Sequence, residues 1–183
     1  MMRCARWAFP LALLLPFAAC AVRQAGPVTT RTAAAPLSTA DIGFVKQAVA
    51  AGAAEMQEAQ LALERAQRPV VKQFAQQIVA DYGSLDPQLS ALAQRKGVAA
   101  PAQPDAAATG AIGELEQARR GFDAAYVRLE LAAQEAAVAL FRQEADTGTD
   151  PDIRAFAQQN LPLVQQHLAM AEALDGRPVA ERM

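Results

Sequence analysis

The sequence predicts an all-α protein, a four-helix bundle with one long connection between its second and third helices. Alanine, the strongest helix former and a poor strand former, makes up roughly a quarter of the 183 residues. Apolar or small residues recur at alternating steps of three and four, which is the period of an amphipathic helix. Only 5% of the residues are aromatic, so small and aliphatic side chains must supply most of the packing between helices.

Residues 1–19 have the features of an export signal. Two arginines precede an apolar run over residues 8–19, which is shorter than the ~20 residues that a membrane-spanning helix needs. Cys20 follows the sequence Phe-Ala-Ala, a pattern that resembles the lipobox of bacterial lipoproteins, where the cysteine is lipidated after cleavage. We therefore expect residues 1–19 to be removed and Cys20 to carry a lipid anchor. An ordinary secretory signal cut near Cys20 is the alternative.

The predicted location is the cell envelope, facing the periplasm. By resemblance to the lipoprotein sorting rule, Ala21 in place of aspartate favours the outer membrane. Residues 20–37 are small, polar and proline-containing, which is typical of a flexible tether between an anchor and a domain. The lipid on Cys20 would then be the contact of the protein with the membrane.

The first two helices have clear start and stop signals. Ser38 is a good N-cap and Asp41, three residues later, completes a variant of the capping box. A seam of apolar and small residues follows to about residue 66. Pro69 suits the first turn of a second helix, and Gly97 after Lys96 is typical of its end.

A long connection precedes the second pair of helices. Residues 98–112 contain two prolines and would reach about 45 Å when extended, whereas the first helix is about 42 Å long. The third helix is predicted over residues 113–145 and the fourth from Pro151 to about Gly176, within a bundle that spans residues 38–176. The connection is long enough for the crossover of ferritin-like folds, with a simple up-down bundle as the alternative. Residues 177–183 are expected to be frayed.

Composition excludes several classes of function. Two of the 17 basic residues lie in the export signal, which leaves 15 against 19 acidic residues and a net charge of −4. A mildly acidic chain is not expected to bind nucleic acid. Cys4 would leave with the signal and Cys20 would be lipidated, so the mature domain would hold no disulfide. No nucleophile elbow or phosphate-binding glycine loop is present, and we expect no enzyme and no cofactor.

Three stretches resemble the bacterial DUF 4142 family of ferritin-like envelope proteins of unknown function. They are DIGFVKQAVAAGAAEMQEAQLALERAQRPVVKQFAQQIVADYG, GFDAAYVRLELAAQEAAVALF and DPDIRAFAQQNLPLVQQHLAMAEAL. The resemblance covers roughly residues 40–174. Many members have histidine where this chain has Tyr82, and many have histidine where it has Gln134, whereas His167 is retained. The resemblance therefore implies a ferritin-like bundle with a reduced set of polar positions.

Metal binding is the most specific chemical function to consider for a bundle of this type. Di-iron bundles use about four carboxylates and two histidines, with Glu-x-x-His on two helices, and this chain has one histidine. Asp81 and His167 are weak candidates for a metal site, and a structural hydrogen bond between them is the preferred interpretation. Tyr82, Tyr126 and Gln134 are candidates for a polar network with this pair. The available glutamates are expected on solvated helix faces, namely Glu55, Glu58, Glu130, Glu135, Glu144 and Glu172.

The sequence therefore favours a non-enzymatic envelope lipoprotein, a helical bundle with an interaction or stress-linked role and a possible protein partner in the envelope. The alternative is a metal-binding or redox ferritin-like protein. A third hypothesis is a small-molecule binder near Pro87 and Pro162, two prolines expected to bend their helices. The pair Arg119-Arg120 is expected to be solvated rather than part of a binding patch.

Overall fold

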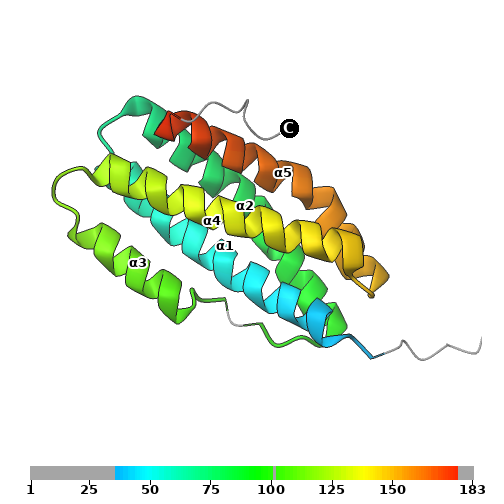
Figure 1. Cartoon of the computed structure of the whole chain (residues 1–183). Helices are drawn as coiled ribbons and strands as arrows, with labels where there is room; N and C mark the ends of the chain where they lie inside the picture. Colours follow the sequence, from blue (N-terminus) through cyan, green and yellow to red (C-terminus); the bar gives the residue numbers. More distant parts are fainter. Residues whose placement is uncertain (1–35, 101, 177–183) are drawn as a thin grey trace, which may run out of the picture. The chain divides into compact units, whose positions relative to one another are not determined.

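The computed structural model describes residues 36–100 and 102–176, and these form five α-helices without a strand (Figure 1). The helices are α1 (Thr39–Arg65), α2 (Pro69–Lys96), α3 (Ala106–Gln117), α4 (Phe122–Thr147) and α5 (Pro151–Asp175). The prediction of an all-α protein is confirmed. The predicted signal peptide, the lipidated Cys20, nearly all of the tether and the frayed C-terminus lie outside the described residues.

The helix ends follow the sequence signals closely. The Asp41 backbone N–H donates to Ser38 Oγ at 3.0 Å and the Ser38 N–H donates to the Asp41 carboxylate at 3.3 Å, which completes the predicted capping box. Asp150 caps α5 by accepting from the backbone N–H groups of Asp152 and Ile153. Gly97 and Gly176 adopt the left-handed conformation after α2 and α5, where residues with a Cβ are strained.

The predicted connection and third helix are divided differently in the structure. Residues from Ala106 onwards, expected to be an extended linker, form α3, whose N-cap Asp105 accepts from the Ala108 N–H at 2.8 Å. The single helix predicted over residues 113–145 is wrong, because the chain leaves the helical conformation at Ala118 and turns at Gly121, where φ is +69°. The chain thus has five helices in its described part rather than four.

The helical unit consists of two helical hairpins, α1–α2 and α4–α5, and of the segment with α3 that connects them. Helices α1 and α2 pack together, α4 packs on α5, α1 packs on α4, and α3 lies against α1 and α4 (Figure 1). The Asp123 carboxylate accepts from the Arg68 N–H at 2.7 Å, and Lys96 Nζ lies 2.7 Å from the Asp150 carboxylate. Helices α2 and α4 therefore begin at the same end of the unit.

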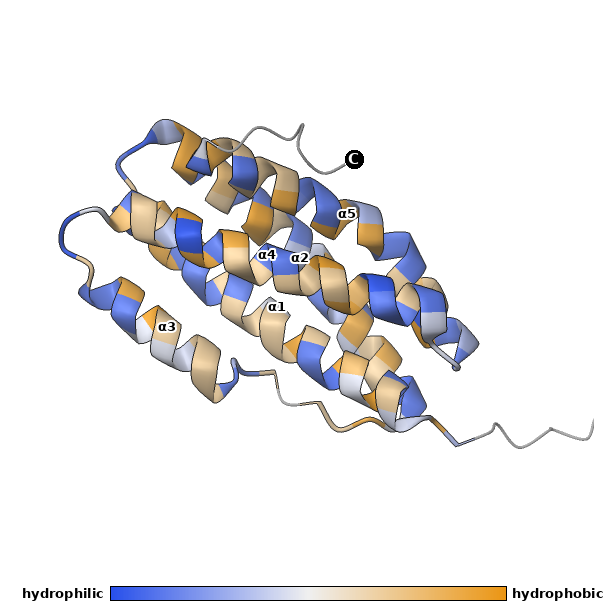
Figure 2. Cartoon of the chain, viewed as in Figure 1, coloured by the Kyte–Doolittle hydropathy of each residue, from blue (hydrophilic) through white to orange (hydrophobic). Residues whose placement is uncertain are grey.

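Small residues and a few aromatic rings form the core. Each helix carries both hydrophobic and hydrophilic residues, as Figure 2 shows. Along α2, apolar side chains spaced at helical steps are buried, namely Val71, Phe74, Ile78, Leu85 and Leu92. Phe44 and Phe141 meet edge to face at 5.2 Å between α1 and α4. No helix in the described part combines the length and the apolar character needed to cross a bilayer.

Candidate functional site

Four of the five helices contribute polar side chains to the interior of the unit. Seven buried residues form what we call the polar cluster: Glu55 and Glu58 of α1, Tyr82 of α2, Tyr126, Glu130 and Gln134 of α4, and His167 of α5. Each of them is at most 4% exposed. Polar groups are rarely buried to this degree without partners, so this cluster is the candidate functional site.

Helical spacing brings the cluster together. Glu55 and Glu58 are three residues apart and Glu130 and Gln134 are four apart, so each pair lies on one face of its helix. The Gln134 side-chain amide donates to Glu130 Oε2 at 3.4 Å. Glu130 in turn interacts electrostatically with both glutamates of α1.

The three glutamates of the polar cluster have raised pKa values, which favours their neutral forms. Burial raises the pKa of Glu58 to about 8, with repulsion from Glu130 adding to the effect. Burial and the carboxylates of Glu130, Glu58 and Asp86 raise the pKa of Glu55 well above its usual range. Burial also raises the pKa of Glu130, although Glu55, Tyr126 and Gln134 partly offset it. No lysine or arginine contributes to these shifts, so protonation is what lowers the cost of burying the carboxyls.

The expectation that the glutamates lie on solvated faces is wrong for four of the six. Glu55, Glu58, Glu130 and Glu144 are buried, whereas Glu135 and Glu172 are partly exposed. Ala132, Ala136 and Ala139 of α4 recur at helical steps of four and three residues, which is typical of a buried face, but the structure exposes all three. Burying an alanine methyl group gains little free energy, so the larger apolar side chains of α4 determine how the helix is rotated about its axis. In that orientation Glu130 points into the interior.

His167 and Asp81, singled out from the sequence, are in direct contact. His167 Nε2 lies 2.8 Å from the Asp81 carboxylate, which also accepts from the Gln77 side-chain amide at 2.8 Å. The Tyr82 ring stacks on the His167 ring with centroids 5.8 Å apart. Burial lowers the pKa of His167, although Asp81 opposes the shift, so the neutral imidazole is favoured.

The three residues expected to form a polar network with this pair are all buried, but only Tyr82 is in contact with His167. Tyr82 interacts with Gln134, and burial together with Glu55 and Glu130 raises its pKa well above the usual range. Tyr126 stacks on Phe122, with their ring centroids 6.4 Å apart. The network thus extends from His167 through Tyr82 and Gln134 to Glu130, and it connects to glutamates that were expected in solvent.

The donor set of the polar cluster suits a hard or borderline cation, but its arrangement does not complete a site. Carboxylate oxygens and imidazole nitrogen are the ligands of iron or manganese in helical bundles. Buried atoms without a hydrogen-bond partner include Glu55 Oε2, Glu58 Oε2, Glu130 Oε1 and His167 Nδ1. Among the residues that the structure describes, however, no three histidine, cysteine, aspartate or glutamate side chains are grouped so that they could hold a metal ion. The residues present therefore do not fit a resident metal centre in this conformation.

A second polar group, which the sequence did not predict, closes one end of the unit. The Asp41 carboxylate accepts from the Thr149 backbone N–H at 2.9 Å and from the Asp150 N–H at 3.2 Å. Burial alone would raise the pKa of Asp41, but hydrogen bonds from Thr149 and Ser38 lower it well below its usual range. Glu144 lies beside it, and burial and Asp41 raise its pKa to about 7. This group ties the start of α1 to the turn between α4 and α5.

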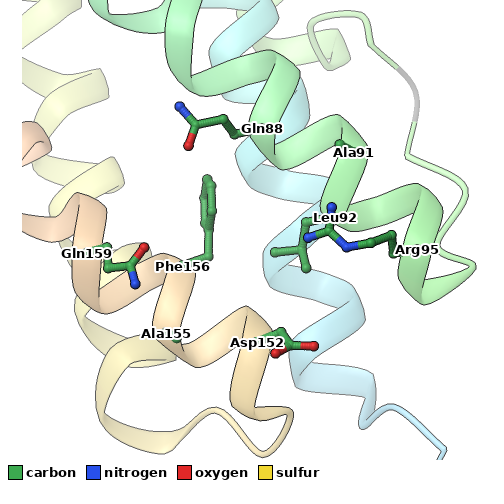
Figure 3. Close-up of a pocket in the computed structure, with 8 residues that line it drawn as sticks. All are labelled: Gln88, Ala91, Leu92, Arg95, Asp152, Ala155, Phe156 and Gln159. Carbon is green, nitrogen blue, oxygen red and sulfur yellow. The ribbon is translucent and has the colours of Figure 1, made fainter.

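The surface of the unit has hollows that do not reach the polar cluster. One, of about 530 Å³, lies between α2 and α5 and is lined by Gln88, Arg95, Asp152, Phe156 and Gln159, among others. Figure 3 shows the Phe156 ring pointing from α5 towards α2, next to Gln88. Neither Pro87 nor Pro162 lines this hollow, and each proline lies inside a continuous helix, α2 or α5.

The comparisons with known proteins identify a family without an assigned activity. The family model described as "Domain of unknown function (DUF4142)" matches residues 26–174. No curated protein matches the chain. A crystal structure of a DUF305 fragment from Deinococcus radiodurans is similar at a TM-score of 0.67 and 21% identity, over 79% of this chain and 100% of that one. At this identity the similarity shows the fold alone. The match over most of its length shows that this chain belongs to the DUF4142 family.

Proposed function

We propose that the protein is a non-enzymatic, ferritin-like helical bundle of the cell envelope that acts through its surface. The observation that carries this proposal is the burial of the polar cluster. Glu130, Gln134 and His167 are 0% exposed, and a substrate cannot reach such groups without opening the bundle. Catalytic groups usually line a cleft that admits their substrate.

The ferritin-like part of the proposal rests on topology. Helices α2 and α4 begin at the same end, so the chain between them must return along the length of the unit, and α3 lies in that returning segment. A long connection between the second and third long helices is the crossover that distinguishes ferritin-like bundles from simple up-down bundles.

The envelope location is proposed from the signal-like start of the chain and the lipobox-like Cys20. We expect Cys20→Ala to release the protein from the membrane fraction of cells that express it, whereas Cys4→Ala, which changes the predicted signal, leaves the mature protein in that fraction. Membrane fractionation followed by immunoblotting measures the distribution. Retention of Cys20→Ala in the membrane to the wild-type extent would refute lipid anchoring.

Metal binding is the second candidate, and the unpartnered oxygens of Glu55, Glu58 and Glu130 favour it. Metal binding would require these donors to converge on a common point, which they do not do in the described structure. The candidate predicts stoichiometric iron, manganese or zinc in purified protein, with the metal lost in Glu130→Gln and in His167→Ala. Elemental analysis of the wild-type protein and both variants distinguishes this candidate from the proposed one.

A further inference from the structure

One end of the helical unit carries a hollow lined by four arginines. The hollow has a volume of about 630 Å³ and is bordered by Arg65, Arg68, Arg119, Arg120 and Phe122. Arg65 is fixed in place, because its guanidinium donates to the Glu116 carbonyl at 2.6 Å and lies 4.7 Å from the centre of the Phe122 ring. Arg65 is therefore part of the wall of the hollow.

The other three arginines have no acidic partner in the described part of the chain. Arg68, Arg119 and Arg120 are exposed, and within residues 36–100 and 102–176 none of them forms an ion pair. The one carboxylate that lines the hollow, Asp123, accepts from the backbone N–H groups of Gln67 and Arg68 at 3.0 and 2.7 Å. Helix α4 starts here without a side-chain cap, so the positive end of its dipole adds to the charge of the guanidinium groups.

An apolar groove adjoins this hollow. It lies between α2 and α5 and has a volume of about 550 Å³. Val70, Phe74, Met170, Ala173 and Leu174 form its apolar lining, and Arg68, Gln73 and Gln77 lie along it as well. Val70 is 46% exposed and is the one large apolar residue in the described part of the chain that is classed as exposed rather than buried or half-buried. Arg68 lines both hollows, so a positive surface continues directly into an apolar one.

We propose that these adjoining hollows bind one anionic lipid, with its phosphate among the arginines and its acyl chain in the α2–α5 groove. The forked guanidinium group matches the oxygens of a phosphate, and charged hydrogen bonds of this kind are about twice as strong as neutral ones. Each hollow lies within the range of roughly 300–1,000 Å³ that is typical of ligand sites. The inference deepens the proposed surface role and rests on it only for the cellular location of the lipid.

The combination of features selects this ligand over simpler ones. An inorganic anion would use the arginines but would leave the groove around Val70 exposed to water. An uncharged lipid would fill the groove but would leave three guanidinium groups without counterions. A phosphate with one acyl chain contacts both surfaces.

Isothermal titration calorimetry on the full chain tests the proposal, with Cys20→Ala introduced so that no attached acyl chain competes. The probes are lysophosphatidic acid below its critical micelle concentration and inorganic pyrophosphate. Two variants separate the surfaces: Arg119→Gln with Arg120→Gln changes the hollow, and Val70→Asn makes the groove more polar without adding a charge. The matched control is Arg95→Gln with Arg142→Gln, two exposed arginines near the opposite ends of α2 and α4.

We expect one equivalent of lysophosphatidic acid to bind more tightly than pyrophosphate. The paired Arg119 and Arg120 substitutions should weaken the binding of both probes at least about tenfold, since each removes a charged hydrogen-bond donor. Val70→Asn should weaken only the acylated probe, and the control variant should bind like the parent. Far-ultraviolet circular dichroism confirms that each variant is folded, and Val70→Ser replaces Val70→Asn if that variant unfolds.

Other outcomes overturn the proposal. Equal affinity for the two probes, or no effect of either Val70 variant, would show an anion site without a lipid chain. Binding to phosphatidylglycerol vesicles without binding to monomeric lysophosphatidic acid would show attraction to a charged membrane surface. Failure of all lipid binding while Cys20→Ala still releases the protein from membranes would refute this inference and leave the envelope location intact.

Discussion

At the scale of single residues, the distinctive feature of this protein is a group of buried carboxyls without a basic partner. Glu55, Glu58 and Glu130 interact across α1 and α4, and burial raises the pKa of all three. Ionising any of them places a charge next to other acidic groups in the interior, which is far more costly than ionisation in water. We therefore infer that Glu58 is mostly protonated in the folded protein at pH 7, and that the shifts at Glu55 and Glu130 favour their neutral forms as well.

Glu58→Gln tests this protonation. Glu58 has a higher pKa in the folded state than in the unfolded state. Its contribution to the free energy of unfolding is therefore fully present below about pH 4.5 and is lost as the pH rises through about 8. The free energy of unfolding of the wild-type protein should therefore decrease between pH 5 and 9. Glutamine resembles the protonated acid, so the variant should decrease less and be more stable than wild type by roughly 1–3 kcal/mol at pH 9.

Urea denaturation at pH 5, 7 and 9 measures this difference, with the exposed Glu114→Gln as control. The pKa of about 6 at Asp86 and of about 7 at Glu144 contribute in the same direction, so a residual slope should remain in Glu58→Gln. Identical pH dependence in wild type and Glu58→Gln would show that Glu58 is ionised in the folded state.

At the scale of helices, the break between α3 and α4 determines where α4 begins and in which direction it runs. Arg65 of α1 donates to the carbonyls of Leu115, Glu116 and Ala118, which satisfies the C-terminal end of α3. The chain then turns at Gly121, whose φ of +69° is in the left-handed region. The turn brings Asp123 to the start of α2 and so aligns α4 with α2.

Two glycine substitutions of opposite expected sign test this element. Gly121→Ala should destabilise the protein by about 1–2 kcal/mol, because a Cβ strains the left-handed conformation. Gly113→Ala within α3 should stabilise it by up to about 1 kcal/mol, because a Cβ there meets no atom within 4 Å and alanine favours the helix. Thermal unfolding measures both, and an equal effect of the two substitutions would contradict the assigned turn.

Local signals in the sequence were sufficient to predict most helix boundaries, but not to predict which side of α4 faces the interior. The capping box at Ser38, the proline at the start of α2 and the glycine after Lys96 act through neighbouring residues, so they can be recognised without the fold. The hydrogen bond between His167 and Asp81 was the interpretation preferred from the sequence, and the two side chains are in contact. The inward rotation of Glu130 and the gathering of arginines around Phe122 depend on helices distant in sequence, and the alanine-rich pattern has too little apolar contrast to predict them.

At the scale of the whole molecule, the packing of the helices and the polar contacts between them hold the described part of the chain together. Phe44, Phe74 and Phe141 lie in a core of mostly alanine, valine and leucine, and the polar cluster interrupts that core. We infer that protonated carboxyls and the neutral His167 fill that interruption. In a metalloprotein, a cation would join the same helices and would supply much of their stability.

Metal content and thermal unfolding with and without a chelator, measured together on the purified protein at pH 7, test this claim most directly. We predict less than a stoichiometric amount of iron, manganese or zinc, and the same melting temperature with and without EDTA. A bound metal in a one-to-one or two-to-one ratio, with a melting temperature that EDTA lowers and Glu130→Gln lowers equally, would contradict the claim.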